Sequence, residues 1–127
     1  MTVLRVLFVD DEPHLLSALR RMLFTERGRW SMQFATGGHE ALALLKHEPV
    51  DVIVTDMRMP GMDGLALLRE VERLYPRTER IVLSGSTEAE APVRARGVAH
   101  EFLNKPCAPE RLIAAIERAG VTSAAGL

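Results

Sequence analysis

The feature that most constrains the fold is an alternation of short apolar runs with longer segments of helical period, repeated five times along 127 residues. Each unit is typical of a β-strand followed by an α-helix, and a series of such units predicts a parallel sheet. The predicted strands are Leu4 to Val9, Met32 to Ala35, Asp51 to Thr55, Arg80 to Leu83 and Glu101 to Leu103. The first, third and fourth runs alternate little, which predicts that they lie at the centre of the sheet.

Apolar residues at helical spacing predict five helices, around Leu15 to Leu23, Ala41 to Leu45, Leu67 to Leu74, Glu88 to Arg96 and Leu112 to Ile116. Asp63 is a predicted N-cap of the third helix, and Pro109 suits the first position of the last one. Pro92 lacks an amide hydrogen, so it should shorten or kink the fourth helix. Ala108 stands where a capping Ser, Asp or Asn is expected.

The length and the 47% hydrophobic composition fit a single compact domain, which we place at residues 1–120. Residues 121–127 are small and weakly patterned, and we expect a frayed C-terminal tail or the start of a linker there. The sequence contains no internal repeat, low-complexity tract or second domain.

The charge balance argues against several classes of partner. Sixteen Lys and Arg face seventeen Asp and Glu, so there is no broad positive field for direct nucleic-acid binding. No segment approaches the roughly 20 apolar residues of a membrane span. Cys107 is the single cysteine, which excludes an internal disulfide and suits a cytoplasmic protein.

Polar residues follow four of the predicted strands. Asp10 and Asp11 come after the first, Asp56 after the third, Ser84 after the fourth and Lys105 after the fifth. Because ligands of open parallel sheets bind beyond the carboxyl ends of the strands, these five residues predict one shared pocket. A single acid at a strand end would more simply be a turn residue, but three acids, a hydroxyl and a lysine together favour a binding site.

Such a group of acids requires positive charge. Two carboxylates about 4 Å apart repel by about 4 kcal/mol at an effective dielectric of about 20. Lys105 supplies one positive charge, and a hard divalent cation, Mg²⁺ or alternatively Mn²⁺, would supply the rest. The four histidines are scattered without ligand spacing, so we expect them on the surface. An aspartate such as Asp56 can also act as a nucleophile toward phosphorus and form an acyl phosphate.

These residues resemble the receiver domain of two-component response regulators. The resemblance rests on the pair Asp10 and Asp11, the stretch VTDMRMPGMDG around Asp56, LSG at Leu83 to Gly85 and FLNKP at Phe102 to Pro106. It covers nearly the whole chain, in order and at the family's spacing. It implies a flavodoxin-like α/β fold, a (βα)5 three-layer sandwich with a parallel five-stranded sheet of order 2-1-3-4-5.

The resemblance also implies roles for the pocket residues. Asp56 would accept a phosphoryl group from a phosphohistidine on a sensor histidine kinase or a phosphotransfer protein. Mg²⁺ would be held by Asp11, Asp56 and the backbone carbonyl of Arg58, with Asp10 acting through water. The metal and Lys105 would neutralise charge on the transferred group. The chain would thus be a signalling module that catalyses its own phosphorylation and dephosphorylation, not an enzyme with a separate substrate.

The implied switch uses two further residues. Ser84 would move toward the phosphoryl group, and Phe102 would rotate into the space that Ser84 vacates, which changes the output surface. Simple core packing is the alternative interpretation of Phe102. The bond between Lys105 and Pro106 resembles the family's cis peptide.

The resemblance extends to partners. The stretch AHEFLNKPCAPERL is most similar to receivers that precede HD-type output domains, so a C-terminal effector of that type is one expectation. A homodimer is another, since many receivers dimerise when phosphorylated. The sequence departs from the family pattern at Pro92, at Ala108 and at Arg58, a position that affects the phosphate lifetime in receivers or is simply solvated here.

Other function classes fit the sequence less well. Acid-rich phosphatases also use an Asp nucleophile with Mg²⁺, but they place a second acid two residues later, where this chain has Arg58. A receiver-like interaction domain without phosphorylation is disfavoured because the acids, Ser84 and Lys105 are all present. Neither a P-loop nor a dinucleotide glycine fingerprint follows the first strand, so nucleotide binding has no support.

Overall fold

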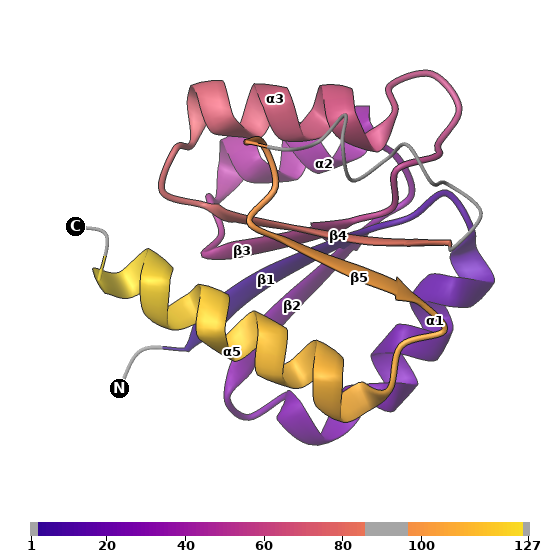
Figure 1. The fold of residues 1–127 in the computed structure, drawn as a ribbon, viewed down its shortest axis with the longest axis vertical. Coiled ribbons are helices and arrows are strands. Elements are labelled where there is room, and N and C mark those ends of the chain that lie inside the picture. Colours follow the sequence, from indigo (N-terminus) through magenta and orange to yellow (C-terminus); the bar gives the residue numbers. More distant parts are fainter. Residues whose placement is uncertain (1–2, 86–96, 126–127) are drawn as a thin grey trace.

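A five-stranded parallel sheet forms the centre of the computed structural model, which describes residues 3–85 and 97–125. The strands are β1 (Leu4–Val9), β2 (Trp30–Ala35), β3 (Val52–Thr55), β4 (Glu79–Gly85) and β5 (Glu101–Lys105). The helices are α1 (Pro13–Met22), α2 (Gly38–His47), α3 (Gly64–Leu74) and α5 (Pro109–Ala125), and a short 3₁₀ helix, η1, spans Phe24–Glu26. Helices α2 and α3 cover one face of the sheet, and α1 and α5 cover the other (Figure 1).

The strand order is β2-β1-β3-β4-β5, and every neighbouring pair is parallel. This confirms the predicted three-layer, flavodoxin-like fold. Strands β1, β3 and β4 lie at the centre, as their apolar sequences predict, and all four residues of β3 are buried. The order reverses at β1, since the chain moves from β1 outward to β2 and then returns past β1 to β3.

The sheet separates two hydrophobic clusters. One joins the sheet to α2 and α3 and contains Leu7, Leu45, Ile53, Leu67 and Leu68. The other joins the sheet to α1 and α5 and contains Phe8, Leu16, Val52, Leu112 and Ile116. Because alternate residues of β1 and β3 belong to opposite clusters, both faces of the central strands are buried, which explains why their sequences are apolar without alternation.

Several strands extend further than the apolar runs predict. Strand β4 continues through Ser84 to Gly85, and β5 continues through Asn104 to Lys105. The register pairs Ser84 with Asn104 and Gly85 with Lys105, so backbone pairing carries both strands beyond their apolar residues. Strand β2 begins earlier than predicted because Trp30 pairs with Leu4. At the ends of β4 and β5 the ladder, not hydrophobicity, sets the strand end.

The predicted helix starts are confirmed where the structure describes them. Asp63 has extended backbone angles at the N-cap of α3, and its carboxylate accepts a hydrogen bond from Ala66 N (2.8 Å). Helix α5 begins at Pro109, directly after Ala108. The predicted helix from Glu88 to Arg96, with Pro92 in it, lies outside the described residues.

Helix α5 continues to Ala125, five residues into the stretch where the sequence predicts a frayed tail. Two contacts attach this end of the helix to the domain. The hydroxyl of Ser123 donates to the carbonyl of Arg77 (3.0 Å), and Gly120 packs so closely on Leu4 that a Cβ there would lie 2.7 Å from Leu4 Cδ1. The prediction of a frayed end is therefore wrong up to Ala125, because packing stabilises a helix that the sequence pattern marks weakly.

Side chains as well as backbone attach the segment before β5 to β4. The N–H of His100 donates to the Arg80 carbonyl (2.7 Å), and the N–H of Arg80 donates to His100 Nδ1 (3.0 Å). The Arg80 side chain is buried, and its guanidinium donates to the carbonyls of Val98 (2.5 Å) and Thr78 (3.1 Å). It also lies 3.5 Å from the Glu72 carboxylate on α3.

Two expectations about the surface can be compared with the structure. All four histidines are exposed, as their scattered positions predict. Among the described residues, none of the helices has the length and apolar character needed to cross a membrane.

Candidate functional site

The carboxyl ends of four strands bring the predicted pocket residues together. Asp10 and Asp11 follow β1, Asp56 follows β3, Ser84 lies near the end of β4 and Lys105 ends β5. Lys105 Nζ lies 2.8 Å from Asp10 Oδ2 and 3.4 Å from Asp56 Oδ2. The hydroxyl of Ser84 donates to Asp56 Oδ1 (3.3 Å). Residues separated by up to 95 positions in the chain therefore meet at one edge of the sheet.

The two carboxylate oxygens of Asp56 have different surroundings. Oδ1 accepts hydrogen bonds from the backbone N–H of Met57 (2.8 Å) and from Ser84. Oδ2 faces Lys105. The side chain is 12% exposed, so it is screened from bulk water but can still be reached. One oxygen is thus held by two donors, while the other faces a cation at the open side of the site.

Burial raises the pKa of Asp56 above its ordinary value, and the charge of Asp10 raises it further, while Lys105 and the Met57 N–H act in the opposite direction. Burial lowers the pKa of Lys105, but its hydrogen bond to Asp10 and the charges of Asp10 and Asp56 outweigh burial and raise it. Lys105 therefore stays protonated at neutral pH. One lysine does not fully compensate the acids around it.

Asp10, Asp11 and Asp56 each offer a carboxylate oxygen, and these three atoms lie within 4.8 Å of one another. A set of oxygen donors with excess negative charge fits a hard divalent cation such as Mg²⁺ and offers nothing to a soft metal. The donor set therefore agrees with the metal that the sequence predicts.

Asp10 differs from the other two acids because both of its oxygens already have protein partners. Oδ1 accepts a hydrogen bond from the backbone N–H of Glu12 (2.9 Å), and Oδ2 pairs with Lys105. Its side chain is also the most buried of the three, at 4% exposure. Asp11 and Asp56 are thus better placed than Asp10 to bind a cation directly.

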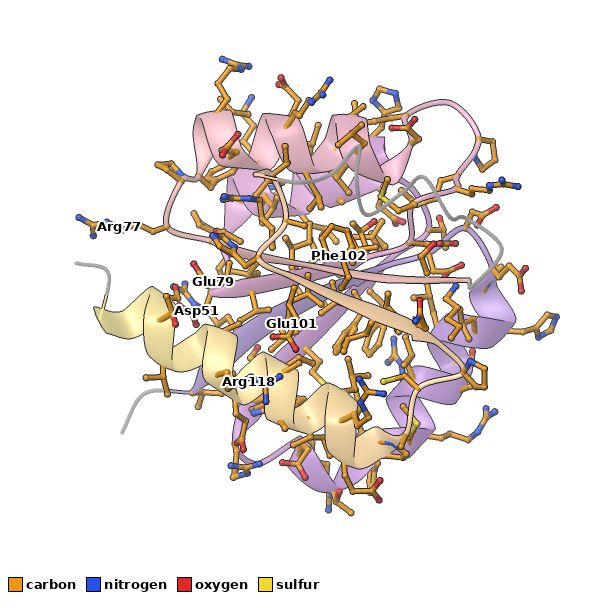
Figure 2. The ribbon with its side chains drawn as sticks, viewed as in Figure 1. Asp51, Arg77, Glu79, Glu101, Phe102 and Arg118 are labelled. Atoms are coloured by element: carbon orange, nitrogen blue, oxygen red, sulfur yellow. The ribbon has the colours of Figure 1, made fainter. Side chains whose placement is uncertain are left out.

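Ser84 and Phe102 lie on the same face of the sheet. Val82 pairs with Phe102 and Ser84 pairs with Asn104, so these residues share one face of neighbouring strands. Phe102 lies on the edge strand β5 and is half-buried against the cluster beneath α2 and α3 (Figure 2). The peptide between Lys105 and Pro106 is cis, as the resemblance predicts. The proposed movement of Ser84 and Phe102 remains a prediction.

Sequence reasoning did not single out two residues that contact the Asp56 backbone. The hydroxyl of Thr55 donates to the Asp56 carbonyl (2.9 Å). Gly64, the first residue of α3, packs against the same carbonyl so closely that a Cβ would lie 2.1 Å from it. The sequence contains weak indications of both, namely a hydroxyl at the end of the apolar run VIVT and a glycine after the N-cap.

Comparison with known proteins finds matches that cover most of the chain. The family model described as response regulator receiver domain matches residues 6–117. The hydrogenase transcriptional regulatory protein HoxA of Cupriavidus necator is 40% identical over 117 residues, which are 90% of this chain and 23% of that protein. This chain thus spans less than a quarter of the length of that curated relative.

Solved structures show the same similarity. A response regulator receiver domain protein from Clostridium thermocellum superposes with a TM-score of 0.90 at 26% identity, covering 98% of this chain and 100% of the other. The signal receiver domain of an HD domain-containing protein from Pseudomonas fluorescens superposes with a TM-score of 0.90 at 28% identity, covering 98% and 99%.

Proposed function

Because this chain belongs to the response regulator receiver domain family, we propose that Asp56 accepts a phosphoryl group in a reaction that depends on a divalent metal. The donor is a phosphohistidine of a sensor histidine kinase or of a phosphotransfer protein. The observation that carries the proposal is the asymmetry at Asp56, where two donors hold Oδ1 while Oδ2 faces Lys105.

The reaction requires one bond to form and one to break. An oxygen of the Asp56 carboxylate bonds to phosphorus, while the bond between phosphorus and the donor imidazole breaks and its electron pair stays on the nitrogen. Lys105 lies 3.4 Å from the carboxylate, close enough to contact an oxygen of the transferred group. Since catalysis of phosphoryl transfer consists largely of positioning and charge neutralisation, a rigid acceptor beside a cation supports this role.

For the metal site, we propose Asp11, Asp56 and the backbone carbonyl of Arg58 as direct ligands. Asp10 acts through water, because its two oxygens are already engaged by Lys105 and the Glu12 N–H. A bound Mg²⁺ or Mn²⁺ would neutralise charge on phosphoryl oxygens. The residues of this chain contribute by holding three carboxylates close together on the ends of two buried strands.

The proposed switch begins at Ser84. Its hydroxyl donates to Asp56 Oδ1, and after phosphorylation it turns to an oxygen of the phosphoryl group. Phe102 lies on the same face of the sheet and moves into the vacated space, so that the surface around β5 and α5 changes. We also propose that the domain catalyses the loss of its own phosphate, since the same groups that favour transfer also favour attack by water.

Two kinds of output are consistent with the relatives. HoxA is a transcriptional regulator, while one solved neighbour is the receiver of an HD domain-containing protein. We propose an HD-type effector on the basis of the stretch AHEFLNKPCAPERL, and a homodimer of the phosphorylated form as a second possibility for output. We place the end of the domain at Ala125, where α5 ends, and its work in the cytoplasm.

Phosphorylation can be tested directly. The protein is incubated with acetyl phosphate and Mg²⁺, and its intact mass is measured against samples with EDTA. We expect one added phosphoryl group in the wild type and in Asp51→Asn, a control at the opposite edge of the sheet, and none in Asp56→Asn or with EDTA. Addition that persists in Asp56→Asn, or no addition to the wild type, would contradict the proposed function.

A further inference from the structure

The peptide that joins Asp56 to Met57 is held at both of its polar atoms. Its carbonyl accepts a hydrogen bond from Thr55 Oγ1 (2.9 Å), and its N–H donates to Asp56 Oδ1 (2.8 Å). In a planar trans peptide these two atoms point in opposite directions, so fixing the carbonyl also fixes the direction of the N–H. The Thr55 hydroxyl therefore fixes the direction of the Met57 N–H, which donates to the Asp56 carboxylate.

Thr55 is well suited to hold this peptide rigidly. Its side chain is buried, at 1% exposure, and a β-branched residue has few χ1 rotamers. Thr55 also lies in β3, between β1 and β4, where the strand has no freedom to shift. The hydroxyl thus transmits the rigidity of the sheet to the first peptide beyond it.

The start of α3 confines the same peptide from another direction. Gly64 N donates to the Met57 carbonyl (2.8 Å), and a Cβ at Gly64 would lie 2.1 Å from the Asp56 carbonyl oxygen and 2.8 Å from Met57 Cα. The peptide is therefore enclosed by Thr55 and Gly64, with its N–H directed at the carboxylate of Asp56.

From these contacts we infer that Thr55 is a positioning residue for phosphoryl transfer to Asp56, an inference that rests on the proposed function. The Thr55 hydroxyl holds the peptide, and the Met57 N–H then holds Oδ1 of the carboxylate. Oδ2 is consequently turned toward Lys105 and the neighbouring acids, where it can attack phosphorus in a fixed direction. Thr55 itself touches no reacting atom.

A simpler explanation is that a buried hydroxyl takes the nearest carbonyl only to satisfy its own hydrogen bond. Thr78 provides a matched control for this explanation. It is buried at 3% exposure, and its hydroxyl also donates to a backbone carbonyl, that of Val50 (2.7 Å), but it lies at the opposite edge of the sheet. Both threonines are buried and both donate to a backbone carbonyl, but only Thr55 is adjacent to Asp56.

The experiment compares Thr55→Val, Thr55→Ser and Thr78→Val with the wild type. The first readout is the amide proton resonance of Met57 in NMR spectra of metal-free, unphosphorylated protein. The second readout is the single-turnover rate of phosphorylation at saturating acetyl phosphate. The acetyl phosphate concentration that gives half of this rate is measured in the same experiment. Loss of an entire oxyanion donor costs about 100-fold or more, so loosening one donor should cost about 10-fold.

We expect Thr55→Val to move the Met57 resonance upfield and to lower the saturating rate about 10-fold without changing the half-saturating concentration. Thr55→Ser, which keeps the hydroxyl, should restore both readouts, and Thr78→Val should change neither. The inference is overturned if Thr55→Val leaves the resonance and rate unchanged, or if Thr78→Val alters them equally. If the wild type takes no phosphate, the proposed function fails, while the Met57 resonance still tests whether Thr55 holds the peptide.

Discussion

Asp56→Asn should make the metal-free protein more stable, because the charge of Asp56 is unfavourable in the folded state. Lys105 Nζ at 3.4 Å attracts this charge by about 5 kcal/mol at an effective dielectric of about 20. Asp10 and Asp11, with oxygens within 4.8 Å, each repel it by at least about 3.5 kcal/mol. The net repulsion is about 2 kcal/mol, and partial screening by solvent reduces the expected gain in unfolding free energy to about 1–2 kcal/mol.

The gain should also depend on pH. Burial and the charge of Asp10 raise the pKa of Asp56 in the folded protein above 3.8, its ordinary value. The folded wild type therefore binds a proton more tightly than the unfolded chain, and its stability falls as the pH rises between the two pKa values. The gain in unfolding free energy of Asp56→Asn over the wild type should be small below pH 3.8 and should reach its full size at neutral pH.

Urea unfolding in EDTA measures this difference, with the fluorescence of the buried single tryptophan, Trp30, as the probe. Asp63→Asn is the control, because Asn caps a helix about as well as Asp and the expected change is below about 0.5 kcal/mol. The electrostatic reasoning is refuted if Asp56→Asn is no more stable than the wild type at neutral pH, or if its gain stays constant down to pH 3.8.

Two further substitutions test the same site by the same unfolding measurement. Magnesium at 100 times its dissociation constant should stabilise the wild type by about 2.7 kcal/mol, and Asp11→Asn should lose most of this increment. An equal increment in the variant would show that Asp11 is not a metal ligand. Gly64→Ala should lower the unfolding free energy by about 2–4 kcal/mol, because its Cβ would lie 2.1 Å from the Asp56 carbonyl oxygen. A loss of unfolding free energy below about 0.5 kcal/mol would show that α3 can move away from this carbonyl.

The fold could be predicted from the sequence because local patterns and global packing agree. Apolar runs without alternation marked the three central strands, and Asp63 marked the start of α3. The site residues were predictable for a related reason, since polar groups that directly follow buried strands must lie at one edge of the sheet. The distances between these residues, and the different surroundings of the two carboxylate oxygens of Asp56, could be determined only from the structure.

Other features depend on contacts that no local pattern encodes. Helix α5 reaches Ala125 because Ser123 and Gly120 pack against distant segments. Thr55 resembles any hydroxyl residue at a strand end until its hydrogen bond to the Asp56 carbonyl is seen. Such features arise from tertiary packing, and periodicity and composition carry no information about them.

The attachment of β5 to β4 has a consequence for how this sequence can change in evolution. The Arg80 N–H is bound by the ring of His100, and the Arg80 guanidinium binds the Val98 carbonyl. A substitution that removes the ring at position 100 would leave the backbone N–H of Arg80 without its acceptor, and a substitution at position 80 would leave the Val98 carbonyl without the guanidinium. We therefore expect relatives to keep a hydrogen-bond acceptor at position 100 and a long donor side chain at position 80, because these two residues attach β4 to the segment that leads into β5, the strand of Phe102 and Lys105.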